Sequence, residues 1–288
     1  MIKKICAITG SNGYVGGLIK NYFTAKGWEV LELTRKPPTN TLAVKFHLGE
    51  DIPPSVLAGV KALVHCAYDF KPLTKEEIWA VNVAGAEKLF KTALEAGVEK
   101  IICLSTISAF PGCHSLYGKA KLDIEKIALR YGAQVVRPGL VYSDNPGGMF
   151  GKLTDQVRNA SWIPLIGDGS QVQFLVHHED LCTIVEFSAS GSVTISTKVI
   201  TAANSTPWSF KELLLEIARR FNKNIKFVPL PWRLVWMGLK SAEICGLRLN
   251  FRSDSLVSLM HQNHAPDFST NYDYGLACRP LEIDKLGI

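Results

Sequence analysis

Long apolar runs are missing from this chain of 288 residues. None approaches the roughly 20 residues of a membrane-spanning helix, and no basic start leads into a signal-type apolar stretch, so we expect neither a membrane span nor export. The seven cysteines show no paired spacing, which argues against a disulfide framework and gives no indication of a metal site. Cys6, Cys66 and Cys103 lie in or beside predicted core strands, where cysteine acts as a small apolar residue. We therefore expect a protein of the reducing cytoplasm.

The chain also lacks any segment in which charges of one sign are concentrated. The net charge of +6 is spread along the chain, and there is no basic cluster of the kind that binds nucleic acid. Internal repeats and low-complexity tracts are also absent. Apolar residues are plentiful at 47%, which is enough for one large core or for a core plus a lobe. The spread charge fits ordinary solubility and would also suit an anionic cofactor and substrate.

A glycine-rich turn follows the first apolar run. The segment TGSNGYVG at residues 9–16 has G-x-x-G-x-x-G spacing and precedes an amphipathic stretch. Gly10 would allow the tight turn, Gly13 would let backbone N–H groups approach a pyrophosphate, and Gly16 would let the helix pack on the strand. The helix N-terminus would then attract the anion. This pattern predicts a dinucleotide-binding βαβ unit, although such turns also occur for structural reasons alone.

Strands and helices alternate along the chain. This favours an α/β fold, a Rossmann-type doubly wound parallel sheet with a smaller C-terminal substrate-binding lobe. We assign residues 1–147 to the dinucleotide-binding core, with 176–201 returning to it, and 148–175 and 202–288 to the lobe. The predicted strands lie near 3–9, 29–34, 43–47, 61–66, 99–105, 133–137 and 193–201. The predicted helices lie near 14–26, 75–97, 116–131, 148–160, 178–190 and 208–222.

A tyrosine and a lysine are spaced for acid–base work. Tyr117 and Lys121 would lie one turn apart on a helix face. A neighbouring ammonium favours the phenolate, so we expect Lys121 to lower the pKa of Tyr117 from about 10. Just upstream, Ser105 and Thr106 follow an apolar strand and could hydrogen-bond a substrate oxygen. The alternative for the pair is two ordinary exposed helix residues.

With these motifs the chain resembles the extended short-chain dehydrogenase/reductases, the NAD-dependent epimerase/dehydratase family. The resemblance extends from Met1 to about residue 230 and more weakly to the end. It implies a homodimer formed through the helices at 75–97 and 116–131. The motifs that carry it are TGSNGYVG at 9–16, HCA at 65–67, VNVAG at 81–85, LST at 104–106, YGKAK at 117–121, RPGLVY at 137–142 and VHHEDL at 176–181.

The resemblance also implies roles for single residues. Tyr117 would donate and accept the proton, and Lys121 would hold the nicotinamide ribose. Thr106 matches the catalytic hydroxyl, with Ser105 as second choice, and Asn82 matches an asparagine that supports the active-site water network. The implied cofactor-binding residues are Gly10, Asn12, Gly13, Tyr14, Val15, Gly16, Arg35, Leu48, Ala67, Tyr117, Lys121, Pro138 and Val141.

The end of the second strand bears on the cofactor. NAD-binding proteins of this fold usually carry an acidic residue there to accept the ribose 2′-OH, whereas this strand ends in Thr34-Arg35-Lys36. Because a guanidinium pairs well with a 2′-phosphate, we expect NADP(H), with NAD(H) as the alternative. Arg35 and Lys36 could also simply solvate a loop. By the resemblance, His47-Leu48 replaces the usual Asp-Leu at the adenine contact, and His65 is either on the cofactor side or a buried, hydrogen-bonded histidine.

The substrate is less well specified. In sugar-nucleotide epimerases of the family, an asparagine and an arginine contact the sugar diphosphate at the positions of Leu140 and Gln173 here. Lys152, Arg158 or Arg252 could supply the missing cations. Residues 229–239 add a stretch with two tryptophans and one arginine, which predicts a lobe helix over the active site or against a dimer partner. The alternative is a peripheral membrane contact that meets a lipid-linked sugar.

Three functions follow from these observations. The first is hydride transfer to or from a secondary alcohol or ketone carbon of a nucleotide- or lipid-linked sugar, as an epimerase or a ketoreductase. The second is an NADPH-dependent reductase of a non-sugar ketone, which Arg35, Leu140 and Phe174 would suit. The third is a non-enzymatic NADP-sensing regulator, against which the Tyr117, Lys121 and Thr106 set argues.

Overall fold

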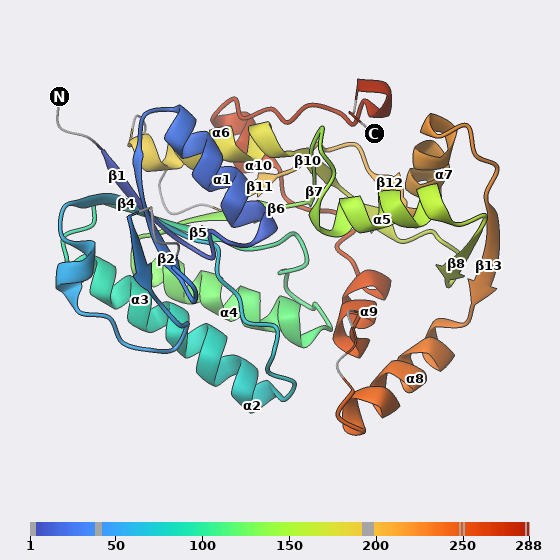
Figure 1. The fold of residues 1–288 in the computed structure, drawn as a ribbon, viewed down its shortest axis with the longest axis horizontal. Coiled ribbons are helices and arrows are strands. Elements are labelled where there is room, and N and C mark those ends of the chain that lie inside the picture. Colours follow the sequence, from blue (N-terminus) through green and yellow to red (C-terminus); the bar gives the residue numbers. More distant parts are fainter. Residues whose placement is uncertain are drawn as a thin grey trace.

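A seven-stranded parallel sheet forms the centre of the molecule (Figure 1). The structure is a computed structural model and describes residues 4–37, 42–191, 199–247, 249, 251–285 and 287. The strand order β11-β6-β5-β4-β1-β2-β3 reverses direction between β1 and β4, and this reversal leaves a crevice outside the carboxyl ends of the strands. The strands are β1 (Ile5–Thr9), β2 (Glu29–Thr34), β3 (Ala43–Lys45), β4 (Val60–His65), β5 (Lys100–Leu104), β6 (Gln134–Pro138) and β11 (Val199–Ala202).

Helices cover both faces of this sheet, as the doubly wound fold requires. On one face, α1 (Tyr14–Ala25) and α6 (His178–Ser190) bury side chains such as Phe23 and Leu181 with the strands. On the other face, α3 (Ala84–Glu95) and α4 (Leu116–Arg130) do the same. The predicted fold class is therefore confirmed.

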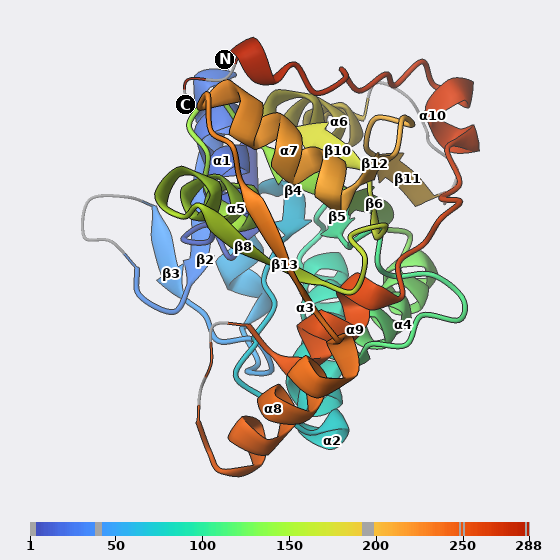
Figure 2. The same cartoon turned by 90° about the vertical axis from the view of Figure 1, so that its right-hand side faces the viewer.

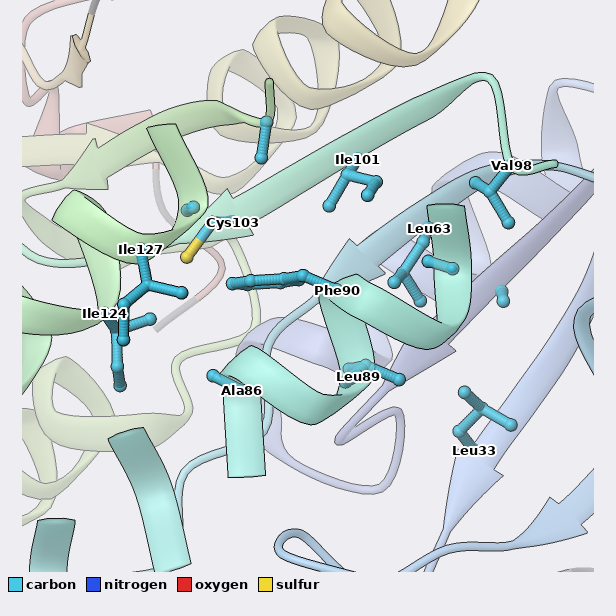
Figure 3. Packing of buried hydrophobic residues seen from close by; sticks show 14 of the residues in the cluster. Leu33, Leu63, Ala86, Leu89, Phe90, Val98, Ile101, Cys103, Ile124 and Ile127 are labelled. Carbon is cyan, nitrogen blue, oxygen red and sulfur yellow. The ribbon is translucent and has the colours of Figure 1, made fainter. Parts of the chain in front are cut away.

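The face beneath α3 and α4 holds a tightly packed apolar cluster (Figure 3). Phe90 of α3 points toward Cys103 of β5, and Ile124 and Ile127 of α4 lie beside it. Phe90 and Cys103 are both fully buried. This packing holds α4 firmly against the sheet, which matters because α4 carries Tyr117 and Lys121.

After β6 the chain leaves the main sheet and forms a second, smaller core. Tyr142, Phe150, Leu213 and Leu214 are buried together in it. Its strand pairs are β7 with β10, β8 with β13, and β9 with β12. The elements here are β7 (Leu140–Tyr142), α5 (Gly148–Asn159), β8 (Trp162–Ile166), β9 (Val172–Gln173), β10 (Leu175–His177), β12 (Trp208–Ser209), α7 (Phe210–Arg220) and β13 (Lys226–Leu230).

The last part of the chain runs back across the molecule (Figure 2). Helix α8 (Trp232–Ile244) packs on α9 (Ser253–Met260), and α9 in turn packs on α4. The short helix α10 (Ser269–Asp273) then lies against β11 at the edge of the main sheet. Short 3₁₀ turns occur at Pro54–Leu57 and Ile283–Lys285.

Two expected elements differ from the structure. The helix predicted over 75–97 is divided into α2 (Lys75–Ile78), a π-helical turn at Trp79–Val83, and α3. The strand predicted over 193–201 is seen at Val199–Ala202, and residues 192–198 lie outside the described part. Short apolar strands such as β7, β8 and β10 were not predicted, because they pair with distant segments and show no clear period of their own.

Candidate functional site

The glycine turn after β1 brings two backbone segments into contact. Gly10 has a φ of 69°, the left-handed conformation that favours glycine. A side chain at Gly16 would place its Cβ 2.2 Å from the carbonyl oxygen of Gly10, so no other residue fits there. Helix α1 begins at Tyr14, and no side chain caps its N-terminal end, which leaves first-turn N–H groups available to an anion. These features fit the pyrophosphate of a dinucleotide.

The turn forms one end of a cavity of about 700 Å³ at the carboxyl ends of the strands, here called the strand-end cleft. The cleft runs from the glycine turn and the end of β2 to the ends of β5 and β6. Every residue expected to bind the cofactor lines it: Gly10, Asn12, Gly13, Tyr14, Val15, Gly16, Arg35, Leu48, Ala67, Tyr117, Lys121, Pro138 and Val141.

The outer end of the cleft presents a cation rather than an acid. Arg35 is exposed and lines the cleft, while Asn12 donates from its Nδ2 to the Thr34 hydroxyl at 2.7 Å. Glu32, the acidic residue nearest this strand end, is 2% exposed and pairs with Lys20 at 3.3 Å. Glu32 is thus not presented to the cleft.

The inner end of the cleft brings Thr106, Tyr117 and Lys121 together. Thr106 and Tyr117 share a side-chain hydrogen bond. Lys121 does not bond to Tyr117; its Nζ donates to the Leu104 carbonyl at 2.8 Å and lies 5.3 Å from the centre of the Tyr68 ring. The lysine is therefore held by the end of β5.

Burial controls the titration of this pair. Desolvation raises the pKa of Tyr117 to about 12, against a smaller lowering by the hydrogen bond with Thr106. Burial also lowers the pKa of Lys121. The expected lowering of the Tyr117 pKa by Lys121 is thus not seen, because Lys121 is directed to a backbone carbonyl and desolvation is the larger effect on Tyr117.

Two aromatic residues that sequence reasoning missed pack on Tyr117. The ring of Tyr68 meets it edge-on at 5.0 Å between centroids, and the ring of Phe70 stacks on it at 5.6 Å. Both follow the HCA motif, so the aromatic spacing after β4 was an available signal. Their contacts cover part of the phenol ring and contribute to its desolvation.

Asn82 lies outside the cleft lining, fully buried in the π-helical turn. Its Oδ1 accepts from the Asp69 backbone N–H at 2.7 Å, and its Nδ2 donates to the Asp69 carbonyl at 3.1 Å. This two-point contact fixes the loop between Tyr68 and Phe70. Asn82 thus reaches the site through that loop rather than by direct contact with Tyr117.

The second-choice hydroxyl is already engaged. Ser105 is 5% exposed and donates its hydroxyl to Glu125, which also accepts from Arg137 at 2.8 and 2.6 Å. This buried network joins β5, α4 and β6 beneath Thr106. Because Ser105 is committed to Glu125, Thr106 is the better placed of the two hydroxyls.

A second cavity of about 690 Å³, here called the apolar cavity, adjoins the first. Thr106 and Tyr117 line both cavities. Apolar side chains form most of its wall, with Lys152 and Arg252 among the polar exceptions. The apolar members of its lining include Ile107, Leu140, Leu153, Ile166, Phe174 and Leu259.

Helix α9 lines the apolar cavity and is tied to α4, the helix that carries Tyr117. Asp254 accepts from the backbone N–H groups of Leu116 and Tyr117 at 2.7 and 3.0 Å, at the start of α4. Arg252 donates to the Phe70 carbonyl at 2.8 Å. No local signal could have indicated the role of Asp254, because it lies 137 residues from Tyr117 in sequence.

His65 is a buried structural histidine. The Thr9 hydroxyl oxygen accepts from the backbone N–H groups of Cys66 and Ala67. Because that oxygen is already an acceptor twice, the hydroxyl proton of Thr9 is donated to Nδ1 of His65 at 2.9 Å. His65 is therefore neutral, and burial, with a further lowering by Lys121, holds its pKa at about 3. Within the described residues there is no cluster of three or more His, Cys, Asp or Glu side chains that could hold a metal.

A model of the NAD dependent epimerase/dehydratase family matches residues 6–191, which include the glycine turn and Tyr117. This chain belongs to that family. It is accordingly an enzyme of the short-chain dehydrogenase/reductase kind. The family resemblance seen in the motifs is confirmed.

Curated relatives act on different substrates. Human sterol-4-alpha-carboxylate 3-dehydrogenase (decarboxylating) is 30% identical over 36% of this chain and 30% of that protein. The ceramide reductase of Caulobacter vibrioides is 27% identical over 61% of this chain and 58% of that protein, so the chain spans less than two thirds of either relative. The UDP-glucose 4-epimerase of Vibrio cholerae is 24% identical over 79% of each.

Solved structures share the fold. MoeE5, in complex with UDP-glucuronic acid and NAD, superposes with a TM-score of 0.69 at 20% identity, over 78% of this chain and 85% of MoeE5. At that identity the likeness establishes the fold alone. Among the described helices, none is both long and apolar enough to span a membrane.

Proposed function

We propose that this enzyme is an NADP(H)-dependent oxidoreductase that acts on a secondary alcohol or ketone carbon of a largely apolar, lipid-like or lipid-linked substrate. One observation carries the proposal: Thr106 and Tyr117 line both cavities and stand where the two meet. A dinucleotide in the strand-end cleft and a substrate in the apolar cavity would both reach this hydroxyl pair.

The residues at the junction supply the acid–base chemistry. A bound nicotinamide dinucleotide would supply or take up the hydride. Tyr117 holds its proton at neutral pH, so it would donate that proton to a ketone oxygen on reduction. For oxidation Tyr117 would first have to release its proton to solvent, and the phenolate would then take the alcohol proton. Thr106 hydrogen-bonds the same oxygen and orients it. Lys121, a buried cation at the end of β5, would hold the ribose hydroxyls.

The charge at the end of β2 supports NADP(H) over NAD(H). Arg35 is exposed on the cleft, where a 2′-phosphate would meet a guanidinium. Glu32 is withdrawn into an ion pair with Lys20 and would not accept a ribose 2′-OH. The solved relatives include NAD complexes such as MoeE5, so NAD(H) is the competing cofactor.

The lining of the apolar cavity supports a lipid-like substrate. Leu140 and the uncharged Gln173 stand at the two positions where sugar-nucleotide epimerases contact a diphosphate, and Phe174 adds apolar surface beside them. Two curated relatives carry names of lipid-modifying enzymes, a sterol dehydrogenase and a ceramide reductase. Lys152 and Arg252 favour a second candidate, epimerisation of a nucleotide sugar, since they could bind a diphosphate.

Turnover by the purified enzyme tests both candidates. NADPH and NADH consumption is followed with a steroid ketone and a long-chain aliphatic ketone, and UDP-glucose is assayed for a 4-epimer. We expect NADPH-dependent reduction of an apolar ketone. Epimerisation of UDP-glucose with a tightly retained NAD, and no ketone reduction, would refute the proposal in favour of the second candidate.

The role of Tyr117 has its own test. Tyr117→Phe removes the proton donor but keeps the ring, so kcat should fall about a hundredfold or more while NADPH affinity changes little. Tyr272→Phe, at a residue 74% exposed, is the control and should behave like the wild type. Turnover of Tyr117→Phe at the wild-type rate would exclude Tyr117 as the acid.

A further inference from the structure

Helix α8 is apolar on both of its faces. Its inner face follows the helical period through Trp232, Val235, Trp236 and Leu239, which are half-buried where α8 packs on α9. The outer face would be polar in an ordinary surface helix. Here it carries large apolar side chains instead, and none of the residues of α8 is buried.

These side chains form an apolar ridge. Leu234, Met237 and Ile244 recur at helical spacing and are 61%, 53% and 77% exposed. Beyond the helix, Leu247 and Leu249 are 58% and 43% exposed. Contiguous apolar surface of this kind marks an interaction site rather than scattered surface leucines.

Cations flank the ridge and the acid is withdrawn from it. Arg233 and Lys240, two turns apart, are both exposed. Glu243 is the helix's only acidic residue, and it accepts from the N–H and hydroxyl of Ser253 at 2.8 and 2.7 Å on the α9 side. Lys240 lies 3.9 Å from Glu243, a distance at which solvent weakens the pairing.

We propose that this outer face of α8 docks on an anionic lipid bilayer, with the apolar ridge in the acyl boundary and Arg233 and Lys240 at the phosphate level. A second copy of the chain is a poorer occupant, because a two-fold contact would set these cations against themselves. Helix α8 lies at the edge of the molecule (Figures 1 and 2), and the side chains of the ridge are exposed.

The same helix pair reaches the substrate site. The inner face of α8 packs on α9, and Ser255, Ser258 and Leu259 of α9 line the apolar cavity. Phe70, which lines both cavities and is 59% exposed, is tied to Arg252 just before α9. A lipid-like substrate could thus pass from a bilayer beneath α8 to the junction; this last step rests on the proposed function, whereas docking does not.

Vesicle co-sedimentation of the full chain tests docking without any activity assay. The probes are vesicles of phosphatidylcholine with phosphatidylglycerol and vesicles of phosphatidylcholine alone. We expect binding to the anionic vesicles that falls with added salt. Serine at Leu234, Met237 and Ile244 together should weaken binding at least a hundredfold. Arg233→Glu should weaken it about thirtyfold, since two charge units change at the surface.

Matched variants keep the test specific. Leu94→Ser with Leu215→Ser removes exposed leucines of α3 and α7, and Lys91→Glu reverses a charge on α3; these should bind as the wild type does. Thermal unfolding verifies that each variant is folded. The predicted loss of vesicle binding with added salt is measured on the wild type and therefore needs no variant. Failure of the wild type to bind anionic vesicles would overturn the docking proposal. It would also be overturned if the wild type were a dimer that the triple serine variant dissociates, because the ridge would then be covered by a second copy. Ketone turnover without vesicle binding would leave the proposed function intact and refute docking alone.

Discussion

At the scale of single residues, removal from water outweighs direct charge contacts around the candidate catalytic group. Tyr117 and Lys121 are both shifted toward their neutral forms by burial, and His65 is held neutral by the same effect. The site is therefore assembled with an acid that keeps its proton at neutral pH. This favours proton donation to a ketone oxygen as the first role of Tyr117.

The neutral state of His65 has a consequence for stability. Its folded-state pKa is about 3 against 6.5 when unfolded, so only the unfolded chain binds this proton as the pH falls between those values. Stability should accordingly fall by about 1.4 kcal/mol per pH unit from this residue alone. In denaturant titrations, His65→Asn should have a lower free energy of unfolding at neutral pH. It should also lack the fall of that free energy with pH that His65 contributes. The exposed His264→Gln should retain it, and an unchanged slope in His65→Asn would contradict the assignment.

Arg35 is predicted to discriminate between the two cofactors. Arg35→Asp should weaken NADPH binding about tenfold to a hundredfold, because a charge-assisted hydrogen bond is replaced by repulsion. NADH binding should change little. Calorimetric titration of both cofactors measures this, with Lys45→Asp at the end of β3 as the charge-matched control. An equal loss for both cofactors would make Arg35 a loop-solvating residue.

At the scale of elements, helix α4 is held at its N-terminus by two parts of the chain. Ser115 caps α4 locally by accepting from the Gly118 N–H at 3.0 Å. Asp254 of α9 accepts from two further N–H groups at the same end. The position of Tyr117 in the first turn thus depends on α9, and the loop that Asn82 fixes braces its ring.

Removal of each N-terminal contact of α4 should have a different effect, because Ser115 acts only on α4 whereas Asp254 also joins α9 to α4. Ser115→Ala and Asp254→Ala should each destabilise the protein by about 1 kcal/mol, since each loses a helix cap. Only Asp254→Ala should also release α9, with faster proteolysis within 232–260 and a lower kcat. Limited proteolysis and thermal unfolding of both variants measure this. Equal proteolysis of the two would show that Asp254 is a cap and nothing more.

At the scale of the whole molecule, the strand-end cleft joins the two cores. Gly10 and Gly13 of the main sheet's first turn line it together with Gly148 and Met149 of α5. The expected division into a core at 1–147 and a lobe at 148–175 and 202–288 stays a prediction, as does a dimer through α3 and α4. A ligand bridging the cleft would stabilise both sides at once.

Hydrogen exchange can follow that coupling. Saturation with NADPH should slow amide exchange both in the glycine turn at 10–16 and in the first turn of α5, and should raise the thermal midpoint. At about a hundred times Kd, the stabilisation should be about 2.7 kcal/mol. Tyr14 links the two segments, because its ring lies against Gly147 and Gly148 at the start of α5. Its hydroxyl also bonds Ser143 at 3.0 Å. Protection confined to the main sheet would show that the cleft does not couple them.

Local patterns determined much of this protein. The period of apolar residues and the glycine turn after β1 predicted the parallel sheet and its covering helices. The family resemblance added the expected cofactor-binding residues, all of which line the strand-end cleft. The local patterns succeed because each such feature depends on near neighbours in sequence. The π-helical turn at Trp79–Val83 escaped prediction, since its i+5 bonding leaves no composition signal.

Only the tertiary structure decided which groups surround Tyr117. Tyr68, Phe70 and Asp254 come from a loop after β4 and from α9, and only folding brings them to α4. Folding also directs Lys121 to the Leu104 carbonyl, and burial raises the pKa of Tyr117 where the helix spacing alone predicted a lowering. The sequence determines which residues carry the chemistry, whereas burial and long-range contacts, which arise only in the folded chain, determine their protonation and neighbours.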